Sequence, residues 1–287
     1  MKVEFERTFR VRHYECDAYE DAFYTSYLRY TQETAMDASA SLGFDGPWYA
    51  ERGTVWLVRD TEIEYLRPVR YGDSVVVKTW VENVRKVMSK RAYELRNSNS
   101  NEVVARAATD WAYLDVKTGK PARIPDEFTE MFLASGGGSA NNNRERFPDP
   151  PAPAGRVFKQ HRRVGWRDVD PAQHVNNTVY LAYAEDCAVE AAVSAGWTPE
   201  RMRAEGVWLI ARKHRIEYRQ PAVLADDLEV ATWVSDAGED RFVRHYAITR
   251  IGDGVVLARA RAELACIEPE KREAMPMPES LRNALID

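Results

Sequence analysis

The stretch Ile63-Glu64-Tyr65 recurs as Ile216-Glu217-Tyr218, 153 positions further along the chain. The same offset, without any gap, aligns further identities over about a hundred positions, and chance does not produce such agreement. It pairs Asp17 with Asp170, Tyr27-Leu28 with Tyr180-Leu181, Gly43 with Gly196, Gly53 with Gly206, Pro68 with Pro221, Thr79-Trp80-Val81 with Thr232-Trp233-Val234, and Ala105-Arg106-Ala107 with Ala258-Arg259-Ala260. The sequence therefore predicts two copies of one domain.

A segment of low complexity separates the copies. Residues 134–143 are rich in glycine, serine and asparagine, and a proline-rich stretch follows at 148–153. The run Gly136-Gly137-Gly138 lacks the Gly-Lys-Ser/Thr ending of a phosphate-binding loop, so it is interpreted as a spacer. We predict a first domain over residues 1–134, a linker over 135–155 and a second domain over 156–287.

Each copy shows the same order of secondary-structure signals. A short extended opening (9–11 and 163–165) precedes one long helical pattern that is rich in small residues and is followed by a glycine. Runs typical of strands come next, separated by short turns that favour antiparallel hairpins. This order of elements predicts an α+β fold. The expected helices are 25–42 and 178–195, and the expected strands are 54–65, 73–84, 89–97, 103–115, 207–218, 227–234, 241–250 and 255–267.

Composition excludes several classes of protein. The 287 residues include 40 Lys and Arg against 45 Asp and Glu, so the net charge of −5 gives no electrostatic drive toward nucleic acid or anionic lipid. Three widely spaced cysteines argue against a disulfide framework and a reactive Cys-x-x-Cys pair. No stretch approaches the roughly 18 apolar residues of a membrane helix, and the first residues lack an apolar signal core. We therefore expect a cytoplasmic protein that binds neither nucleic acid nor membrane.

One turn in copy two combines groups that can perform chemistry. The stretch Asp168-Val169-Asp170-Pro171-Ala172-Gln173-His174-Val175-Asn176-Asn177-Thr178 places a carboxylate, an imidazole and two amides directly before a helix. Free N–H groups at a helix start can stabilise an oxyanion, and a nearby carboxylate can attack a carbonyl or activate water. The pattern indicates acyl transfer, with Asp170 as base or nucleophile and His174 orienting water or substrate.

Simpler explanations exist for some of these residues. Asn176 or Asn177 can cap the helix, and Asp170-Pro171 can form a turn. We expect Asn177 to be the cap. For Asp170 and His174 we favour a catalytic role, because a turn alone does not explain both.

At these residues the sequence resembles hotdog-fold thioesterases, and more closely the acyl-ACP thioesterases, which carry two hotdog repeats in one chain. The resemblance implies a tandem hotdog fold, in which each copy wraps an antiparallel sheet around a long central helix. It also implies that the second half carries catalysis while the first half forms much of the acyl cavity. Catalytic candidates are then Asp170 and His174, and substrate-binding candidates include Asn176, Asn177 and Thr178. The stretches that carry the resemblance are 32–35, 72–75, 79–81, 124–127, 170–181 and 216–219.

The sequence departs from the family's motifs at two places, which limits how many of the family's catalytic residues can be assigned to this chain. Ala172 stands where the family has an asparagine, and Pro221-Ala222 stand where it has a Glu-Cys pair. A cysteine nucleophile is therefore excluded at that position, and Cys187 and Cys266 are expected to be buried thiols. What remains is similar to the 4-hydroxybenzoyl-CoA thioesterase group, in which an aspartate before the helix acts together with backbone amides.

Copy one retains an aspartate in the equivalent turn, Asp17, which makes it a reserve candidate for catalysis. Its other groups differ, because Asp21 replaces the imidazole and Phe23-Tyr24 replace the two asparagines. We therefore expect a degenerate site in this half.

The remaining polar clusters are weaker signals. His13, His161, His214 and His245 show no spacing typical of metal ligands, so neither a metal nor another cofactor is expected. The basic residues Arg212, Lys213 and Arg215 fit either a solvated strand end or a contact with the phosphates of a carrier.

The leading hypothesis is hydrolysis of an acyl-ACP or acyl-CoA thioester to a fatty or aromatic acid and a thiol. Two alternatives stay open: an acyl-CoA hydratase or dehydratase on the same fold, and a noncatalytic protein that binds acyl thioesters. We expect acyl-CoA or acyl carrier protein as the partner. We also expect the two copies to associate as two hotdog protomers do, and a homo-oligomer stays open.

Overall fold

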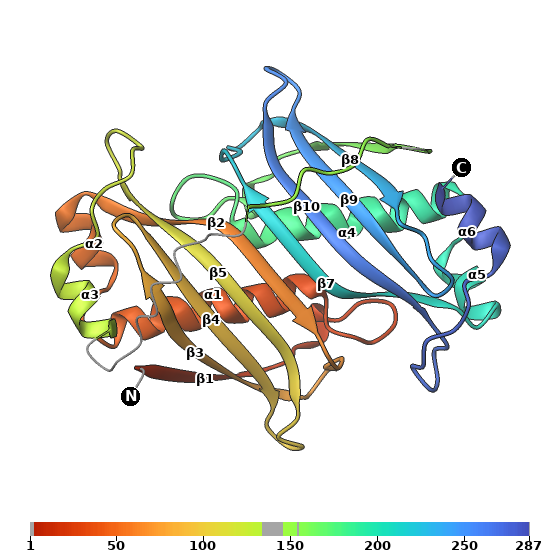
Figure 1. The fold of residues 1–287 in the computed structure, drawn as a ribbon, viewed down its shortest axis with the longest axis horizontal. Coiled ribbons are helices and arrows are strands. Elements are labelled where there is room, and N and C mark those ends of the chain that lie inside the picture. Colours follow the sequence, from red (N-terminus) through yellow and green to blue (C-terminus); the bar gives the residue numbers. More distant parts are fainter. Residues whose placement is uncertain (1–2, 134–145, 154, 287) are drawn as a thin grey trace. The chain divides into compact units, whose positions relative to one another are not determined.

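The structure is a computed structural model that describes residues 3–133, 146–153 and 155–286. The chain divides into two compact units, Met1–Arg146 and Phe147–Asp287. Both units contain the same elements in the same order, as the repeat predicts (Figure 1).

Unit 1 wraps one antiparallel sheet around a long helix. Its strand order is β1-β3-β4-β5-β2, and every neighbouring pair is antiparallel. The elements are β1 (Glu4–Arg10), α1 (Tyr24–Ala40), α2 (Gly46–Arg52), β2 (Thr54–Tyr65), β3 (Ser74–Val84), β4 (Met88–Asn97), β5 (Val103–Asp115) and α3 (Asp126–Leu133).

Unit 2 repeats this topology with strand order β6-β8-β9-β10-β7, again antiparallel throughout. Its elements are β6 (Phe158–Arg163), α4 (Asn177–Ser194), α5 (Pro199–Ala204), β7 (Trp208–Tyr218), β8 (Asp227–Ser235), β9 (Arg241–Arg250), β10 (Val256–Ile267) and α6 (Glu279–Ile286). The α+β tandem hotdog prediction is confirmed.

Small side chains let each long helix lie close to its sheet. Ala35 and Ala38 of α1 are buried, as are Ala184 and Ala191 of α4, and the two helices pack mainly on β3 and β8. Figure 1 shows each helix running across one face of the strands of its own unit. Alanine has little side-chain volume and little rotamer entropy to lose, which suits a helix buried against a sheet.

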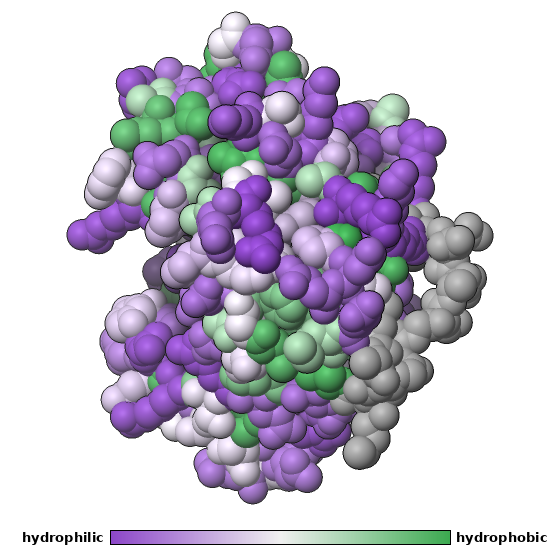
Figure 2. Space-filling model, turned by 90° about the vertical axis from the view of Figure 1, so that its left-hand side faces the viewer, coloured by the Kyte–Doolittle hydropathy of each residue, from purple (hydrophilic) through white to green (hydrophobic). Residues whose placement is uncertain are grey.

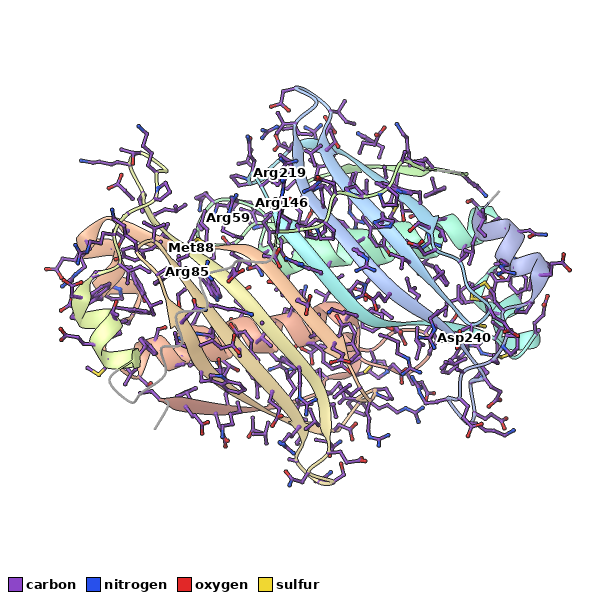
Figure 3. All side chains as sticks on the ribbon, viewed as in Figure 1. Arg59, Arg85, Met88, Arg146, Arg219 and Asp240 are labelled. Atoms are coloured by element: carbon purple, nitrogen blue, oxygen red, sulfur yellow. The ribbon has the colours of Figure 1, made fainter. Side chains whose placement is uncertain are left out.

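Most predicted boundaries agree closely with the structure. Each of the predicted strands ends within one residue of its observed position, and the turn between β3 and β4 is closed by a hydrogen bond from Arg85 N to Met88 O (2.6 Å) (Figure 3). The edge strands β1 and β6 begin several residues before the predicted extended openings. The four short helices α2, α3, α5 and α6 were not predicted.

Part of the predicted linker packs on the sheet of unit 2. Residues 135–145 and 154 lie outside the described residues, but Phe147 is buried and lies 5.2 Å from the guanidinium of Arg259. Asp149 accepts a hydrogen bond from Arg259 (3.0 Å), and the Pro151 carbonyl accepts one from the Trp233 indole (3.3 Å). These contacts fasten the segment from Phe147 to Pro151 to β10 and β8.

The face shown in Figure 2 is largely hydrophilic, with apolar residues gathered in a patch low on that face. Among the helices in the described ranges, none has the length and apolar character needed to cross a membrane.

Candidate functional site

The turn between β6 and α4 is a tight, hydrogen-bonded loop. Val169 and Val175 form an isolated antiparallel bridge, and inside it Asp170 N donates to His174 O at 3.1 Å. Gln173 N donates to Asp170 O at 2.9 Å, and Gln173 closes the turn with a φ of 66°. This left-handed conformation is uncommon for a residue other than glycine, so the surrounding bonds determine it.

Two neighbouring segments anchor this loop. Val175 N donates to Ala222 O (2.8 Å), and Ala222 N donates to the hydroxyl of Tyr180 (2.8 Å). The hydroxyl of Tyr218, at the end of β7, donates to the carbonyl of Asn177 at 3.0 Å. Burial raises the pKa of Tyr180 to about 12, so this hydroxyl is neutral at pH 7. The loop is therefore held by fixed neutral groups.

The carboxylate of Asp170 is partly buried and accepts two hydrogen bonds. Oδ1 accepts from Ala172 N at 2.9 Å, and Oδ2 accepts from the side-chain Nδ2 of Asn176 at 3.0 Å. An ionised carboxylate has about four acceptor positions, so both oxygens keep room for a water or a substrate group.

Asn176 joins this carboxylate to the helix. Its Oδ1 accepts from Thr178 N (3.0 Å) and from Thr178 Oγ1 (2.8 Å), which makes Asn176 the N-cap of α4. The prediction that Asn177 is the cap is wrong, because the helix begins at Asn177 and the capping residue precedes the first helical residue.

The capping hydrogen bond of Asn176 also determines which main-chain N–H at the start of α4 is left without an acceptor. Thr178 is buried and its N–H is bound to Asn176, so this amide does not point to a substrate while the cap is formed. Asn177 is the first residue of the helix, and its N–H has no acceptor inside the helix. Asn177 therefore carries a main-chain N–H at the helix start that its own helix does not use.

His174 lies in the same loop but does not hydrogen-bond to the carboxylate of Asp170. The ring is partly buried, and its Nδ1 is 3.5 Å from the carbonyl oxygen of Val175. The structure thus links Asp170 and His174 through their main chains and gives the Asp170 side chain a different partner, Asn176.

Copy one has a loop with the same main-chain hydrogen bonds, but Phe23 stands in place of Asn176, so no amide side chain at this position contacts the aspartate. Asp17 N donates to Asp21 O (2.8 Å), Glu20 takes the left-handed position with φ 69°, and the Asp17 carboxylate accepts from Tyr19 N (2.8 Å) and Asp21 N (3.1 Å). The N-cap of α1 is Phe23, whose side chain makes no capping hydrogen bond. The backbone frame is conserved between the copies, while the side-chain chemistry is not.

The basic residues Arg212, Lys213 and Arg215 lie within β7 and not at one of its ends. The alternative that they form a solvated strand end is therefore wrong. Lys213 is opposite Glu263 of β10, and the Arg215 guanidinium lies 5.5 Å from the ring of Phe147. Arg212 is at the β-bulge, since the register with β10 shifts between Glu263 and Leu264. Arg219, labelled in Figure 3, follows the end of the strand.

The two cysteines of unit 2 are buried thiols. Burial raises the pKa of Cys187 to about 12 and that of Cys266 to about 11, so neither is a thiolate at pH 7. The prediction that they are buried is confirmed. In the part of the chain that the structure describes, no group of three His, Cys, Asp or Glu side chains could hold a metal ion.

Sequence reasoning named Asn176 and Asp170 but missed the contact between them, and it missed the two anchors, Tyr180 and Tyr218. A signal for the anchors was present, because both tyrosines belong to the repeat. Tyr27 accepts from Val69 N in unit 1 (3.1 Å), as Tyr180 accepts from Ala222 N in unit 2.

Comparison with known proteins gives consistent results for both copies. Residues 2–132 match the model of the acyl-ACP thioesterase N-terminal domain, and residues 164–285 match that of the thioesterase-like superfamily. The chain is 25% identical over 268 residues to acyl-[acyl-carrier-protein] hydrolase FATB2 of Cuphea viscosissima, covering 90% of this chain and 62% of the relative. It is 24% identical over 268 residues to a palmitoyl-acyl carrier protein thioesterase of Cuphea hookeriana, of which it covers 61%. The chain therefore spans about three fifths of the length of these relatives.

Solved structures share the fold. The 12:0-ACP thioesterase from Umbellularia californica superimposes with a TM-score of 0.74 at 21% identity, covering 92% of this chain and 94% of the other. An acyl-ACP thioesterase from Bacteroides thetaiotaomicron gives a TM-score of 0.71 at 16% identity, with coverages of 91% and 97%.

Proposed function

We propose that this chain, which belongs to the hotdog-fold thioesterases and is similar to acyl-ACP thioesterases, hydrolyses acyl thioesters to a free acid and a thiol. Its substrates are acyl chains on acyl carrier protein or coenzyme A. The observation that carries the proposal is the 3.0 Å hydrogen bond between Asn176 and Asp170 at the start of α4. It fixes a carboxylate beside the amide end of a helix, where a thioester carbonyl can be attacked and its oxyanion held.

Asp170 is the reactive group of this proposal. Ala172 and Asn176 hold the carboxylate in one orientation, and the remaining lone pairs accept a proton from water or attack the carbonyl carbon. In the first route, Asp170 takes a proton from water as the water oxygen bonds to the carbonyl carbon; the C–S bond of the tetrahedral intermediate then breaks, and the leaving thiolate takes up the proton. In the second, Asp170 forms a mixed anhydride and the thiolate leaves.

Oxygen-18 tracing in a single turnover can identify the covalent route. A mixed anhydride opened by water at the aspartyl carbon leaves label in the Asp170 carboxylate, so label in the enzyme supports this route. Label in the acid product alone fits direct attack by water and also an anhydride opened at the acyl carbon. Both routes need the same carboxylate.

The Asn177 amide is the proposed oxyanion donor. Tyr218 fixes the carbonyl of Asn177, which holds this residue at the helix start. The developing negative charge then meets a free N–H and the positive end of the helix dipole. His174, on the same loop, orients water or the leaving thiol. Arg212, Lys213 and Arg215 on β7 are the proposed contacts for the phosphates of the carrier.

Thiol release tests this function directly. Saturated acyl-ACP and acyl-CoA of several chain lengths are supplied, the free thiol is read with a thiol reagent, and the acid is identified by mass spectrometry. The proposal expects one acid for every thiol released. Hydration of an enoyl thioester without thiol release would contradict it, as would tight binding of acyl thioesters with no turnover on any of them.

A further inference from the structure

A buried hydroxyl group on α4 lies close to a carboxylate but is not bonded to it. Tyr183 is 1% exposed, and its hydroxyl makes no hydrogen bond with any of the residues that the structure describes. The guanidinium of Arg162 lies 4.5 Å from the centre of its ring. Burial raises the pKa of Tyr183, as does the nearby carboxylate of Asp168, so the hydroxyl is neutral at pH 7. A buried hydroxyl without a partner costs free energy and therefore needs an explanation.

The equivalent tyrosine of copy one has a partner. Tyr30, 153 positions earlier in the chain, is also buried, and its hydroxyl donates to Oε2 of Glu15 at 2.7 Å. Arg12 holds the same carboxylate, because its N donates to Oε2 (2.8 Å) and its Nη1 donates to Oε1 (3.3 Å). The carbonyl of Glu15 accepts from the N–H of Phe23, the N-cap of α1, at 2.8 Å. One glutamate thus fastens the loop of copy one to its helix.

Copy two keeps this frame with a shorter side chain. Asp168 stands at the position of Glu15, and Gly165 stands at the position of Arg12. Oδ2 of Asp168 accepts from Gly165 N at 2.8 Å, and the carbonyl of Asp168 accepts from Asn176 N at 2.9 Å. The main-chain bonds are the same in both copies, while the carboxylate is one methylene group shorter and the bond to the tyrosine is missing.

The shorter carboxylate belongs to the residue that anchors Asn176. The main chain of Asn176 is bonded to Asp168, and its side chain donates to Oδ2 of Asp170 at 3.0 Å. A bond between Tyr183 and the side chain at position 168 would fasten this series of contacts to the interior of α4. Elements that move during function are drawn from the less stable parts of a protein, and added stability there commonly lowers activity.

We propose that Asp168 is a positioning residue that acts on Asp170 through Asn176, and that its short side chain leaves the loop free to move during turnover. The degenerate loop of copy one is held fast by the bond between Glu15 and Tyr30. This inference rests on the proposed function, but its effect on stability can be measured without it.

Asp168→Glu supplies the missing methylene group and tests the inference. The longer carboxylate should reach Tyr183 as Glu15 reaches Tyr30, so the melting temperature should rise by about 2–4 °C. With a saturating acyl thioester, kcat should fall about fivefold with little change in KM, because the added bond must break in each turnover. Amide hydrogen exchange over residues 168–178 should slow. A purely structural role would not move stability and kcat in opposite directions.

Two further variants are matched controls. Tyr183→Phe added to Asp168→Glu removes the new bond, so kcat should recover and the gain in melting temperature should disappear. Glu15→Asp makes the reverse change in copy one. It should lower the melting temperature by a similar amount and leave kcat unchanged, because the loop of copy one does not carry the proposed catalytic aspartate.

An unchanged or lower melting temperature in Asp168→Glu would overturn the inference, since it would show that the Tyr183 hydroxyl is already satisfied, for example by a bound water. A raised melting temperature with wild-type kcat would also overturn it, as would a loss of kcat that persists in the double variant. If Asp168→Glu fails to fold, Tyr183→Phe alone decides, because removal of an unbonded hydroxyl should not lower the melting temperature and a loss of stability would contradict the inference.

Failure of the proposed function gives a different result. If the wild type releases no thiol from any acyl thioester, hydrolysis is excluded, and hydrogen exchange still tests the positioning role. Slower exchange over residues 168–178 in Asp168→Glu, reversed by Tyr183→Phe, would support restraint of the loop by this bond. Equal exchange in the wild type and Asp168→Glu would overturn it.

Discussion

Asn176 connects Asp170 to helix α4: its Nδ2 is 3.0 Å from Oδ2 of Asp170, and its Oδ1 caps the helix at Thr178 N. One amide side chain thus has two roles, orienting a carboxylate and satisfying the first turn of a helix. These two roles can be separated by substitution.

Asn176→Ala should lose both roles. We expect the free energy of unfolding to fall by about 0.5–2 kcal/mol, the usual effect of removing a cap, and turnover to fall because Asp170 is no longer oriented. Asn176→Ser should keep most of the stability, since serine is a good N-cap, while turnover stays low because the hydroxyl cannot both cap Thr178 and reach Asp170.

Chemical denaturation and kcat for these variants, beside Asn177→Ala, check the assignment. Asn177→Ala should leave the cap intact, since only its main-chain amide is used. Full turnover in Asn176→Ser would show that the contact with Asp170 has no positioning role.

His174→Ala should lower kcat more than it raises KM, because the imidazole is expected to act on water or the leaving group near the reacting carbonyl. Its ring makes only a long contact with Val175 O, so the melting temperature should change little. A variant with ordinary kinetics and a lower melting temperature would show that His174 is structural.

His214 makes stability depend on pH. Burial lowers its pKa to about 3 in the folded protein, while an unfolded imidazole titrates near 6.5. Below pH 6.5 the unfolded chain therefore binds the extra proton, and stability that is complete above this pH is lost as the pH falls toward 3. The loss from this group approaches about 1.4 kcal/mol per pH unit.

Denaturation of His214→Gln between pH 7 and 4.5 checks this expectation. The variant should show a shallower fall in stability than the wild type. Equal slopes for His214→Gln and the wild type would contradict the assignment.

The repeat and the alternating pattern of the strands predicted most of the fold. β2 and β5 match their predicted bounds fully because turn residues stand at both ends of each strand. The short helices α2 and α5 were not predicted, although Asp45 and Thr198 cap them. Each helix is only about two turns long, which is too short to show a repeating pattern of apolar residues.

The sequence predicts the candidate residues of the Asp170 loop but not the hydrogen bonds that connect them. Asp170 stood out as a carboxylate before a helix, whereas the choice between Asn176 and Asn177 depends on a one-residue helix boundary that sequence does not resolve. The direction of the His174 ring depends on the left-handed turn at Gln173, a residue type that rarely adopts this conformation.

The central claim is that the carboxylate of copy two performs hydrolysis, and paired aspartate variants test it most directly. Asp170→Asn and Asp17→Asn preserve size and change the same group at equivalent loop positions. Thiol release under saturating acyl-ACP should fall about 10²–10⁴-fold in Asp170→Asn, with an unchanged melting temperature, and should change little in Asp17→Asn. Near-normal turnover in Asp170→Asn together with a loss of that size in Asp17→Asn would contradict the account and assign catalysis to copy one.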